Sequence, residues 1–231
     1  MPLANPAPTL PDRRRAVQLA GPLALASYVA FGAAAALLVL LHLIPALGDA
    51  LDPVTAMLSE YAYTPGRWIW ALSLTLTSAG SVALLIALHR NGILRDRIAG
   101  FALSAWCVGI LAVAVFVKDP QGGAVSLTGK LHLGATAVAC ATLPVAGLAL
   151  ARRHSGDPRW WRWAVWTRRL ALASIPFFLP FIVPFILNTV AGTQVLPTVA
   201  TGLIERLMAA LELVLLTVLA TWARGAATAE P

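Results

Sequence analysis

Charged side chains are scarce in this chain of 231 residues, because Asp, Glu, Lys and Arg together make up only 12% of it. A soluble domain usually contains about 25%. The mean hydropathy is +0.78, and 59% of the residues are hydrophobic. This composition excludes an ordinary water-soluble domain and is typical of a membrane protein.

Cysteine is scarce as well. Cys107 and Cys140 are the only two cysteines, and both fall inside apolar runs, where a small thiol suits packing. The sequence therefore offers no disulfide framework and no Cys-rich metal motif. It also lacks the HExxH zinc motif, the GxSxG nucleophile motif and a glycine-rich phosphate loop. We predict no cofactor and assign no catalytic residue.

Lysine is nearly absent, with only Lys118 and Lys130, whereas arginine is abundant. This bias is common in high-GC bacterial proteins and indicates a bacterial cell membrane. The formal net charge is +7. It does not indicate a nucleic-acid partner, because nucleic acid needs basic residues gathered on one accessible face of a folded domain, and here they separate apolar runs.

The sequence contains long apolar runs, which a soluble protein would interrupt with charged residues. About 20 apolar residues in a helix cross the hydrocarbon of a bilayer, and six runs are long enough. We predict an all-α integral membrane protein, a six-helix bundle over residues 21–222, between a disordered basic tail at 1–20 and a C-terminal tail at 223–231. The predicted spans are 21–44, 68–88, 98–117, 131–150, 170–191 and 201–222.

The basic residues lie mostly on one side of this topology. Thirteen of the seventeen fall before the first span, between the second and third, between the fourth and fifth, and after the sixth. Only four fall on the other side, namely Arg67, Lys118, Lys130 and Arg206. Cytoplasmic loops carry the excess of Lys and Arg, so we predict that both termini are cytoplasmic.

The connection from Arg152 to Arg169 mixes arginine with tryptophan. Its four tryptophans are Trp160, Trp161, Trp163 and Trp166. This mixture suits the headgroup layer, so we predict contact with anionic lipid there. An RNA-stacking surface would also mix arginine with aromatic residues and is the weaker alternative on a segment so short and so closely tethered.

Glu212 is an acidic residue inside the last apolar run. It lies about eleven residues into that run, which places it about 16 Å deep, where a charge costs at least about 2.5 kcal/mol on insertion scales. Glu205 lies seven residues earlier on nearly the same helix face. Together they could form a proton path or the wall of a site. In the alternative, Glu212 is neutral and hydrogen-bonded to a Ser or Thr of a neighbouring helix.

His132 begins the fourth run, and His42 at the end of the first run is a candidate companion. A catalytic zinc needs three protein ligands, which two histidines and a nearby carboxylate could supply. The sequence shows no metal-ligand spacing, so we predict no metal site. A His132 that only makes structural hydrogen bonds is the simpler alternative.

Prolines recur at every fourth position of the fifth run, at Pro176, Pro180 and Pro184. An interior proline removes a backbone donor and disturbs the preceding turn, so we expect this helix to bend. Broken helices often line transporter sites, although bent scaffolding helices are commoner.

Short polar motifs stand at the ends of the apolar runs. They are Leu58-Ser59-Glu60-Tyr61, Gly66-Arg67-Trp68, Lys118-Asp119-Pro120, Gly129-Lys130-Leu131-His132 and Gly202-Leu203-Ile204-Glu205-Arg206-Leu207. In these motifs and their order the chain resembles the membrane proteins grouped as domain of unknown function 998, from about Gly21 to Trp222. The resemblance implies a six-helix membrane fold and no particular activity. It also implies shared polar residues near one face, here Ser59, Tyr61, Asp119, His132, Glu205 and Arg206.

These six residues form the predicted site, an outward-facing polar pocket that binds a lipid or a small amphipathic molecule. Arg206 would pair with an anionic group, and Tyr61 and His132 would donate hydrogen bonds. One alternative is an intramembrane lipid hydrolase in which His132 and an acidic partner activate water, with or without a metal. Another is a proton-coupled transporter that uses Glu212, although the sequence shows no inverted repeat.

Overall fold

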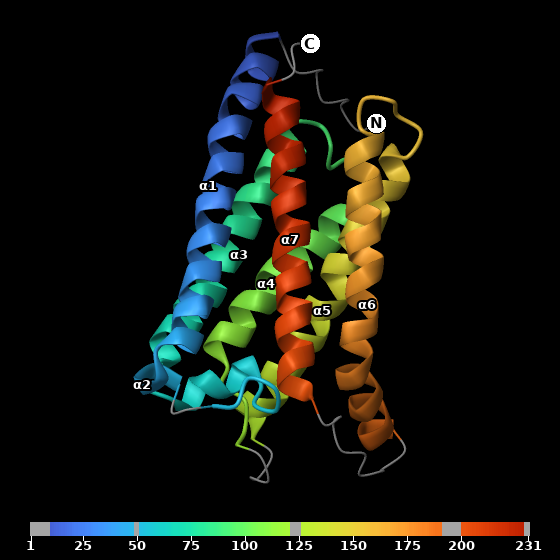
Figure 1. Ribbon diagram of the computed structural model, residues 1–231. Coiled ribbons are helices and arrows are strands. Elements are labelled where there is room, and N and C mark those ends of the chain that lie inside the picture. Colours follow the sequence, from blue (N-terminus) through green and yellow to red (C-terminus); the bar gives the residue numbers. More distant parts are fainter. Residues whose placement is uncertain (1–9, 49–50, 121–125, 191–199, 229–231) are drawn as a thin grey trace.

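The computed structural model describes residues 10–48, 51–120, 126–190 and 200–228. Within these residues six long helices and two short ones follow one another (Figure 1). The long helices are α1 (Leu10–Leu43), α3 (Arg67–Arg90), α4 (Arg97–Val115), α5 (Leu127–His154), α6 (Trp161–Val190) and α7 (Thr201–Thr228). The short helices, α2 (Pro45–Gly48) and the 3₁₀ helix η1 (Leu58–Tyr63), lie between α1 and α3.

Five of the described helices are long and apolar enough to cross a membrane, namely α1, α3, α4, α5 and α6. The prediction of an all-α, multi-pass membrane protein is therefore confirmed. Helix α7 carries Glu205, Arg206 and Glu212 among its apolar residues and packs against α1 and α6 (Figure 1). That α7 is a sixth crossing, and that the membrane is the cell membrane, stay predictions.

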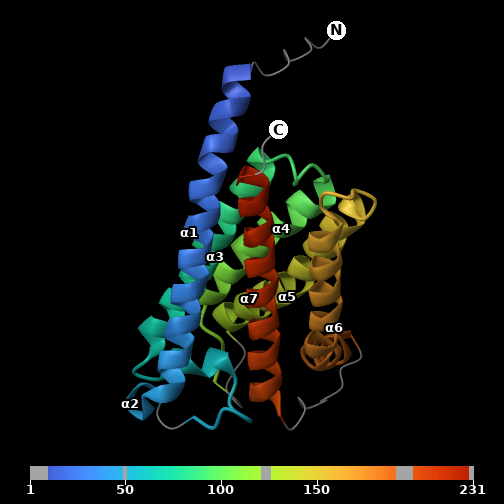
Figure 2. The ribbon, with the colours of Figure 1, turned by 45° about the horizontal axis from the view of Figure 1, so that its top comes forward.

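The beginning of α1 and the end of α7 lie at the same end of the bundle, which we call the terminal end (Figure 2). The connections α3–α4 and α5–α6 lie there too: Asn91 Nδ2 donates to the Ala223 carbonyl at 2.7 Å, and the His154 and Trp222 rings are 5.1 Å apart. The opposite end, which we call the η1 end, holds η1 and the first turns of α3, α5 and α7. Which end faces the cytoplasm stays a prediction from the distribution of charge.

Both terminal helices are longer than predicted. Helix α1 begins at Leu10, so residues 10–20 are helical and not part of a disordered tail, and α7 continues to Thr228 through the first part of the predicted tail at 223–231. Residues 12–20 contain neither proline nor glycine, and residues 223–228 are rich in alanine, the strongest helix former. The remaining parts of both predicted tails, 1–9 and 229–231, lie outside the described residues.

The connection predicted between the fourth and fifth spans, from Arg152 to Arg169, is mostly helical. Helix α5 runs to His154 and α6 begins at Trp161, so the turn covers only residues 155–160. Gly156 and Pro158 stand in that turn, where a helix is readily interrupted. Residues 161–169 contain neither residue type, and the helix therefore continues beyond the apolar run.

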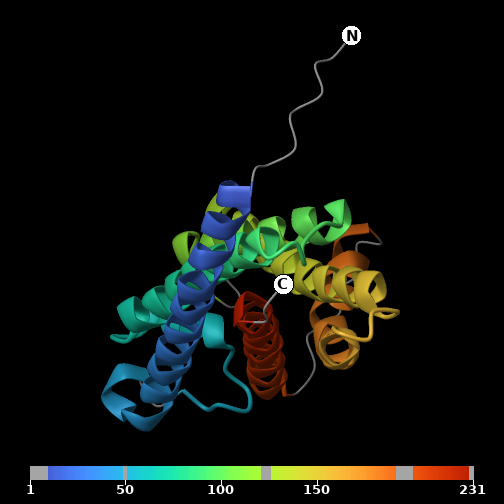
Figure 3. The ribbon, with the colours of Figure 1, turned by 90° about the horizontal axis from the view of Figure 1, so that it is seen from above.

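The six long helices form a ring in the order α1, α3, α4, α5, α6 and α7, which closes back on α1 (Figure 3). Small residues let neighbouring helices approach closely where lipid provides no hydrophobic drive. Gly80 of α3 is one such residue, because a Cβ there would lie 2.8 Å from the Phe31 ring and 2.9 Å from the Ala30 Cβ of α1.

The centre of the ring is packed with apolar side chains toward the terminal end. Trp222, Leu219, Leu88 and Leu150 are fully buried there, together with Trp106 nearer the middle of the bundle. Protein interiors are normally packed without large voids. The inside of the ring is filled in this way at the terminal end and hollow at the η1 end.

Candidate functional site

A cavity of about 400 Å³ opens inside the ring at the η1 end. Its walls are mostly aliphatic and aromatic side chains, and it extends to Trp106 and Leu216, near the middle of α4 and α7. The polar side chains that line it are Ser59, Thr77, Lys118, Asp119, Lys130, His132, Thr136, Cys140, Glu205 and Glu212. Ligand cavities typically measure about 300 to 1,000 Å³ and combine apolar walls with a few polar groups, and this cavity has the same character.

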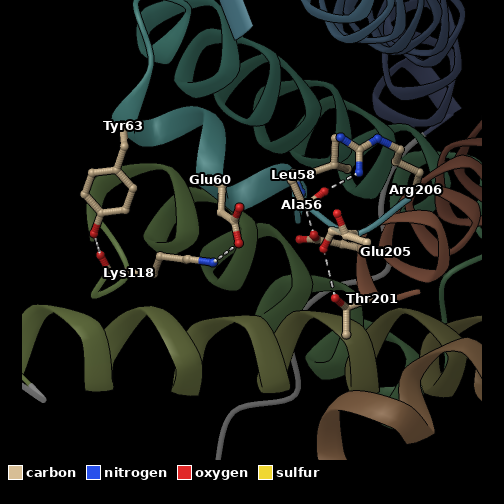
Figure 4. Close-up of polar contacts among 9 residues, drawn as sticks. Ala56, Leu58, Glu60, Tyr63, Lys118, Thr201, Glu205 and Arg206 are labelled. Carbon is tan, nitrogen blue, oxygen red and sulfur yellow. Dashed lines mark hydrogen bonds and ion pairs between the residues drawn. The ribbon is translucent and has the colours of Figure 1, made fainter. Parts of the chain in front are cut away.

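One edge of the cavity mouth is formed where the first turn of α7 meets the chain before η1. Glu205 Oε2 accepts a hydrogen bond from the Leu58 amide at 2.6 Å (Figure 4). Thr201 Oγ1 donates to the Thr55 carbonyl at 3.1 Å, and the Leu203 amide donates to Val54 O at 3.0 Å. These contacts fix the Glu205 side chain at the cavity wall.

Arg206 is directed away from the cavity and holds three parts of the chain together. Its Nη1 donates to the Ala56 carbonyl at 2.6 Å and to Gly202 O at 3.0 Å. Its Nε donates to His42 Nε2 at 2.6 Å, while His42 Nδ1 lies 2.6 Å from Leu38 O. A side chain at Gly202 would overlap the Ala56 carbonyl oxygen, so glycine is needed for this close approach.

Tyr61 also lies outside the cavity lining. It is 2% exposed and packs in an apolar cluster with Leu41 and Trp70. Its ring meets the His42 ring edge-on, with centroids 5.6 Å apart, and a Cβ at Gly48 would lie 3.0 Å from it. The side chain therefore anchors η1 against the end of α1.

Of the six residues predicted to form the pocket, the structure brings four together at the cavity, namely Ser59, Asp119, His132 and Glu205. Glu212 lines the same cavity more deeply. Sequence reasoning placed Lys118 and Lys130 on the same side as the pocket residues but did not include them in the pocket, although both line the cavity. The signal that could have found them is their position beside Asp119 and His132 in two of the helix-end motifs.

Asp119 is held in place by the beginning of α5. Its carboxylate accepts from the Ser126 amide at 2.9 Å and from Ser126 Oγ at 2.6 Å, and Ser126 Oγ accepts from the Gly129 amide at 3.0 Å. The hydrogen bonds from Ser126 lower the pKa of Asp119 below its usual value. A Cβ at Gly129 would overlap the Asp119 carboxylate, so this charge lies directly against the helix.

Lys118 is tied to η1 from the other side of the mouth. Its Nζ lies 3.3 Å from Glu60 Oε1, and its backbone carbonyl accepts a hydrogen bond from the Tyr63 hydroxyl (Figure 4). Burial and the nearby Asp119 carboxylate raise the pKa of Tyr63, so this hydroxyl remains a donor. Lys118 and Asp119 thus present opposite charges at the same rim.

His132 joins the end of α4 to α5. Its side chain is 6% exposed, and its Nδ1 lies 2.7 Å from the Phe116 carbonyl oxygen. A carbonyl only accepts, so Nδ1 is the donor, and in the neutral ring Nε2 is left as an acceptor. His132 therefore lines the cavity with a ring that is held against the end of α4.

Glu212 is 6% exposed, and its Oε1 is buried without a hydrogen-bond partner among the described residues. His42, the candidate companion of His132, bonds instead to Arg206 on the α1 side. Within the described part of the chain, no three His, Cys, Asp or Glu side chains come together in the way metal ligands would.

A family model described as protein of unknown function (DUF998) matches residues 31–222. The chain belongs to the DUF998 family. Comparison with curated proteins and with solved structures gave no match. The matched segment contains all six of the predicted pocket residues and Glu212, so the cavity lies within the part of the chain that the family shares.

Proposed function

We propose that this protein binds a lipid or a small amphipathic molecule in the cavity at the η1 end. One observation carries the proposal: a single cavity combines charged groups at its mouth with apolar walls that reach the middle of the bundle. An amphipathic molecule has the same division, since its polar head needs hydrogen bonds or charge and its chain is stabilised by burial.

The mouth favours an anionic or zwitterionic headgroup. Lys118 and Lys130 line it together with Asp119. Lys118 is paired with Glu60 at 3.3 Å, whereas Lys130 is exposed and therefore reachable. An ammonium group binds phosphate or carboxylate through charge-assisted hydrogen bonds. In this arrangement Lys130 takes the role that sequence reasoning gave to Arg206, whose Nη1 and Nε are bonded to Ala56, Gly202 and His42. His132 Nε2 accepts from the headgroup or from a water on it.

Filling the cavity tests the proposal. Ala209 lines the cavity, whereas the next residue, Ala210, is exposed on the outside of α7. In Ala209→Trp the indole occupies the space for the chain, so binding of radiolabelled octadecanoate to the detergent-solubilised protein should fall at least tenfold. Ala210→Trp adds the same indole on the outer surface and should bind like the wild type. Equal binding by all three proteins would remove the proposal.

Proton-coupled transport is the second candidate, favoured by the observation that Glu205 and Glu212 line one cavity. A carboxyl that carries a proton cannot be replaced by an amide. In liposomes, Glu212→Gln should then abolish proton flux while leaving ligand binding intact. Identical flux in the variant and the wild type would dismiss transport through this pair.

A further inference from the structure

Glu212 is the deepest carboxyl group of the cavity. It lies seven residues beyond Glu205 on α7, which is about 10 Å along the helix axis. The side chain lines the cavity, is 6% exposed, and has a buried Oε1 without a partner among the described residues. A buried acceptor without a donor destabilises the protein, so a group that donates to Glu212 gains binding energy that an apolar wall does not offer.

Three polar side chains of the cavity wall are already engaged. Thr77 and Thr136 each donate to the backbone carbonyl four residues earlier, at 2.9 Å. Trp106 Nε1 donates to Ser81 Oγ at 3.0 Å. A hydroxyl and an indole have one donor hydrogen each. None of these three side chains therefore has a hydrogen left for Glu212.

We propose that Glu212 recognises a hydrogen-bond donor carried on the apolar part of the ligand. The ligand class is then an amphiphile with a hydroxyl or N–H group about 10 Å from its polar head, the spacing of two helical turns on α7. This inference rests on the proposed function, because it requires the headgroup to lie at the mouth. It adds selectivity, since a plain hydrocarbon chain would bury Glu212 without a partner.

A series of chain-hydroxylated fatty acids tests this role. The probes are octadecanoate and derivatives in which a single hydroxyl is moved along the chain, measured by equilibrium binding to the solubilised full chain. The derivative with its hydroxyl about 10 Å from the carboxylate should bind about tenfold more tightly than octadecanoate, the effect of one hydrogen bond at a buried group. Glu212→Leu should lose this preference and still bind octadecanoate, and Glu212→Gln should retain it.

Thr77→Val is the matched control, because it removes a cavity hydroxyl that already bonds within its own helix. Its preference for the hydroxylated probe should equal that of the wild type. Glu212→Leu should also unfold at no lower temperature than the wild type, since it loses no hydrogen bond. A lower unfolding temperature, or a preference that survives in Glu212→Leu, would overturn the inference.

The outcomes separate this inference from the proposed function. If octadecanoate binds to the wild type but no hydroxylated derivative binds more tightly, the role of Glu212 is wrong and the binding cavity stands. If no probe binds to the wild type, the binding function fails and the role of Glu212 fails with it.

Discussion

Arg206 links the chain before η1, the first turn of α7 and the end of α1 through hydrogen bonds to Ala56, Gly202 and His42. We predict that Arg206→Ala lowers the free energy of unfolding by about 1 to 3 kcal/mol, because buried carbonyl groups lose a charged donor. Thermal unfolding in detergent measures this change. The affinity of the folded variant for a ligand in the cavity should stay close to that of the wild type.

Arg67→Ala is the control, because Arg67 is exposed and stacks on the exposed Trp68 ring, 4.8 Å from its centroid. It should change the free energy of unfolding by no more than about 0.5 kcal/mol. An Arg206→Ala variant of unchanged stability that has lost its ligand would contradict this account and restore the guanidinium as a ligand-binding group.

The Asp119 carboxylate is expected to protect the amide of Ser126 from hydrogen exchange. The pKa of Asp119 is lower in the folded protein than in the unfolded chain, where it is about 3.9. The contact is therefore fully present at a pH above the unfolded-state pKa and is lost as the pH falls through the folded-state pKa. At neutral pH, the Ser126 amide should therefore exchange its hydrogen faster in Asp119→Asn than in the wild type. The difference should shrink below about pH 4, and equal exchange at neutral pH would show that the contact does not form.

The residues that sequence reasoning misplaced lie next to residues that it placed correctly. Glu205 and Arg206 are consecutive, and consecutive helical side chains point about 100° apart, so a helix that directs Glu205 into the ring directs Arg206 toward α1. Ser59 and Tyr61 are two positions apart in a 3₁₀ helix with three residues per turn, and they also point in different directions. A shared end of the bundle was predictable from the sequence, whereas a shared cavity was not.

The positions of the long helices were largely predictable because polar or helix-breaking residues separate one apolar run from the next. Helix α3 was expected at 68–88 and spans Arg67–Arg90, and α4 was expected at 98–117 and spans Arg97–Val115. The early start of α6 was missed because a mixture of Arg and Trp has no apolar run. Tertiary packing sustains that turn of helix: Ala164 and Thr167 are buried there.

The first turns of α6 remain a predicted contact for anionic lipid. Trp161 and Trp166 are each about half exposed, and Arg169 lies over the Trp166 ring, 5.5 Å from its centroid. Each basic residue near an anionic surface contributes about 1 kcal/mol. The double variant Arg168→Gln and Arg169→Gln should therefore weaken the retention of phosphatidylglycerol about tenfold or more, measured by lipid titration in nanodiscs.

The matched control for this lipid contact is Arg67→Gln at the opposite end of the bundle, which also removes an arginine stacked on a tryptophan. This control removes one basic residue instead of two, and no second arginine is adjacent to it in the sequence, so its replacement should have a small effect. Equal loss of lipid from both variants would mean that the beginning of α6 has no special affinity.

At the scale of the whole molecule, the ring of helices is filled at the terminal end and hollow at the η1 end. The sequence predicts the runs and their order, but a cavity depends on which helices become neighbours and on how far their side chains reach across the ring. Trp106 and Leu216 close the cavity from α4 and α7, two helices far apart in the sequence. No local pattern could have predicted that pairing.

Native mass spectrometry of the gently solubilised protein tests the central claim most directly. The account predicts that one amphipathic molecule remains bound to each wild-type chain and to Ala210→Trp, and that Ala209→Trp has lost it. It would be contradicted if the wild type retained no such molecule, or if the indole inside the cavity left the bound mass unchanged.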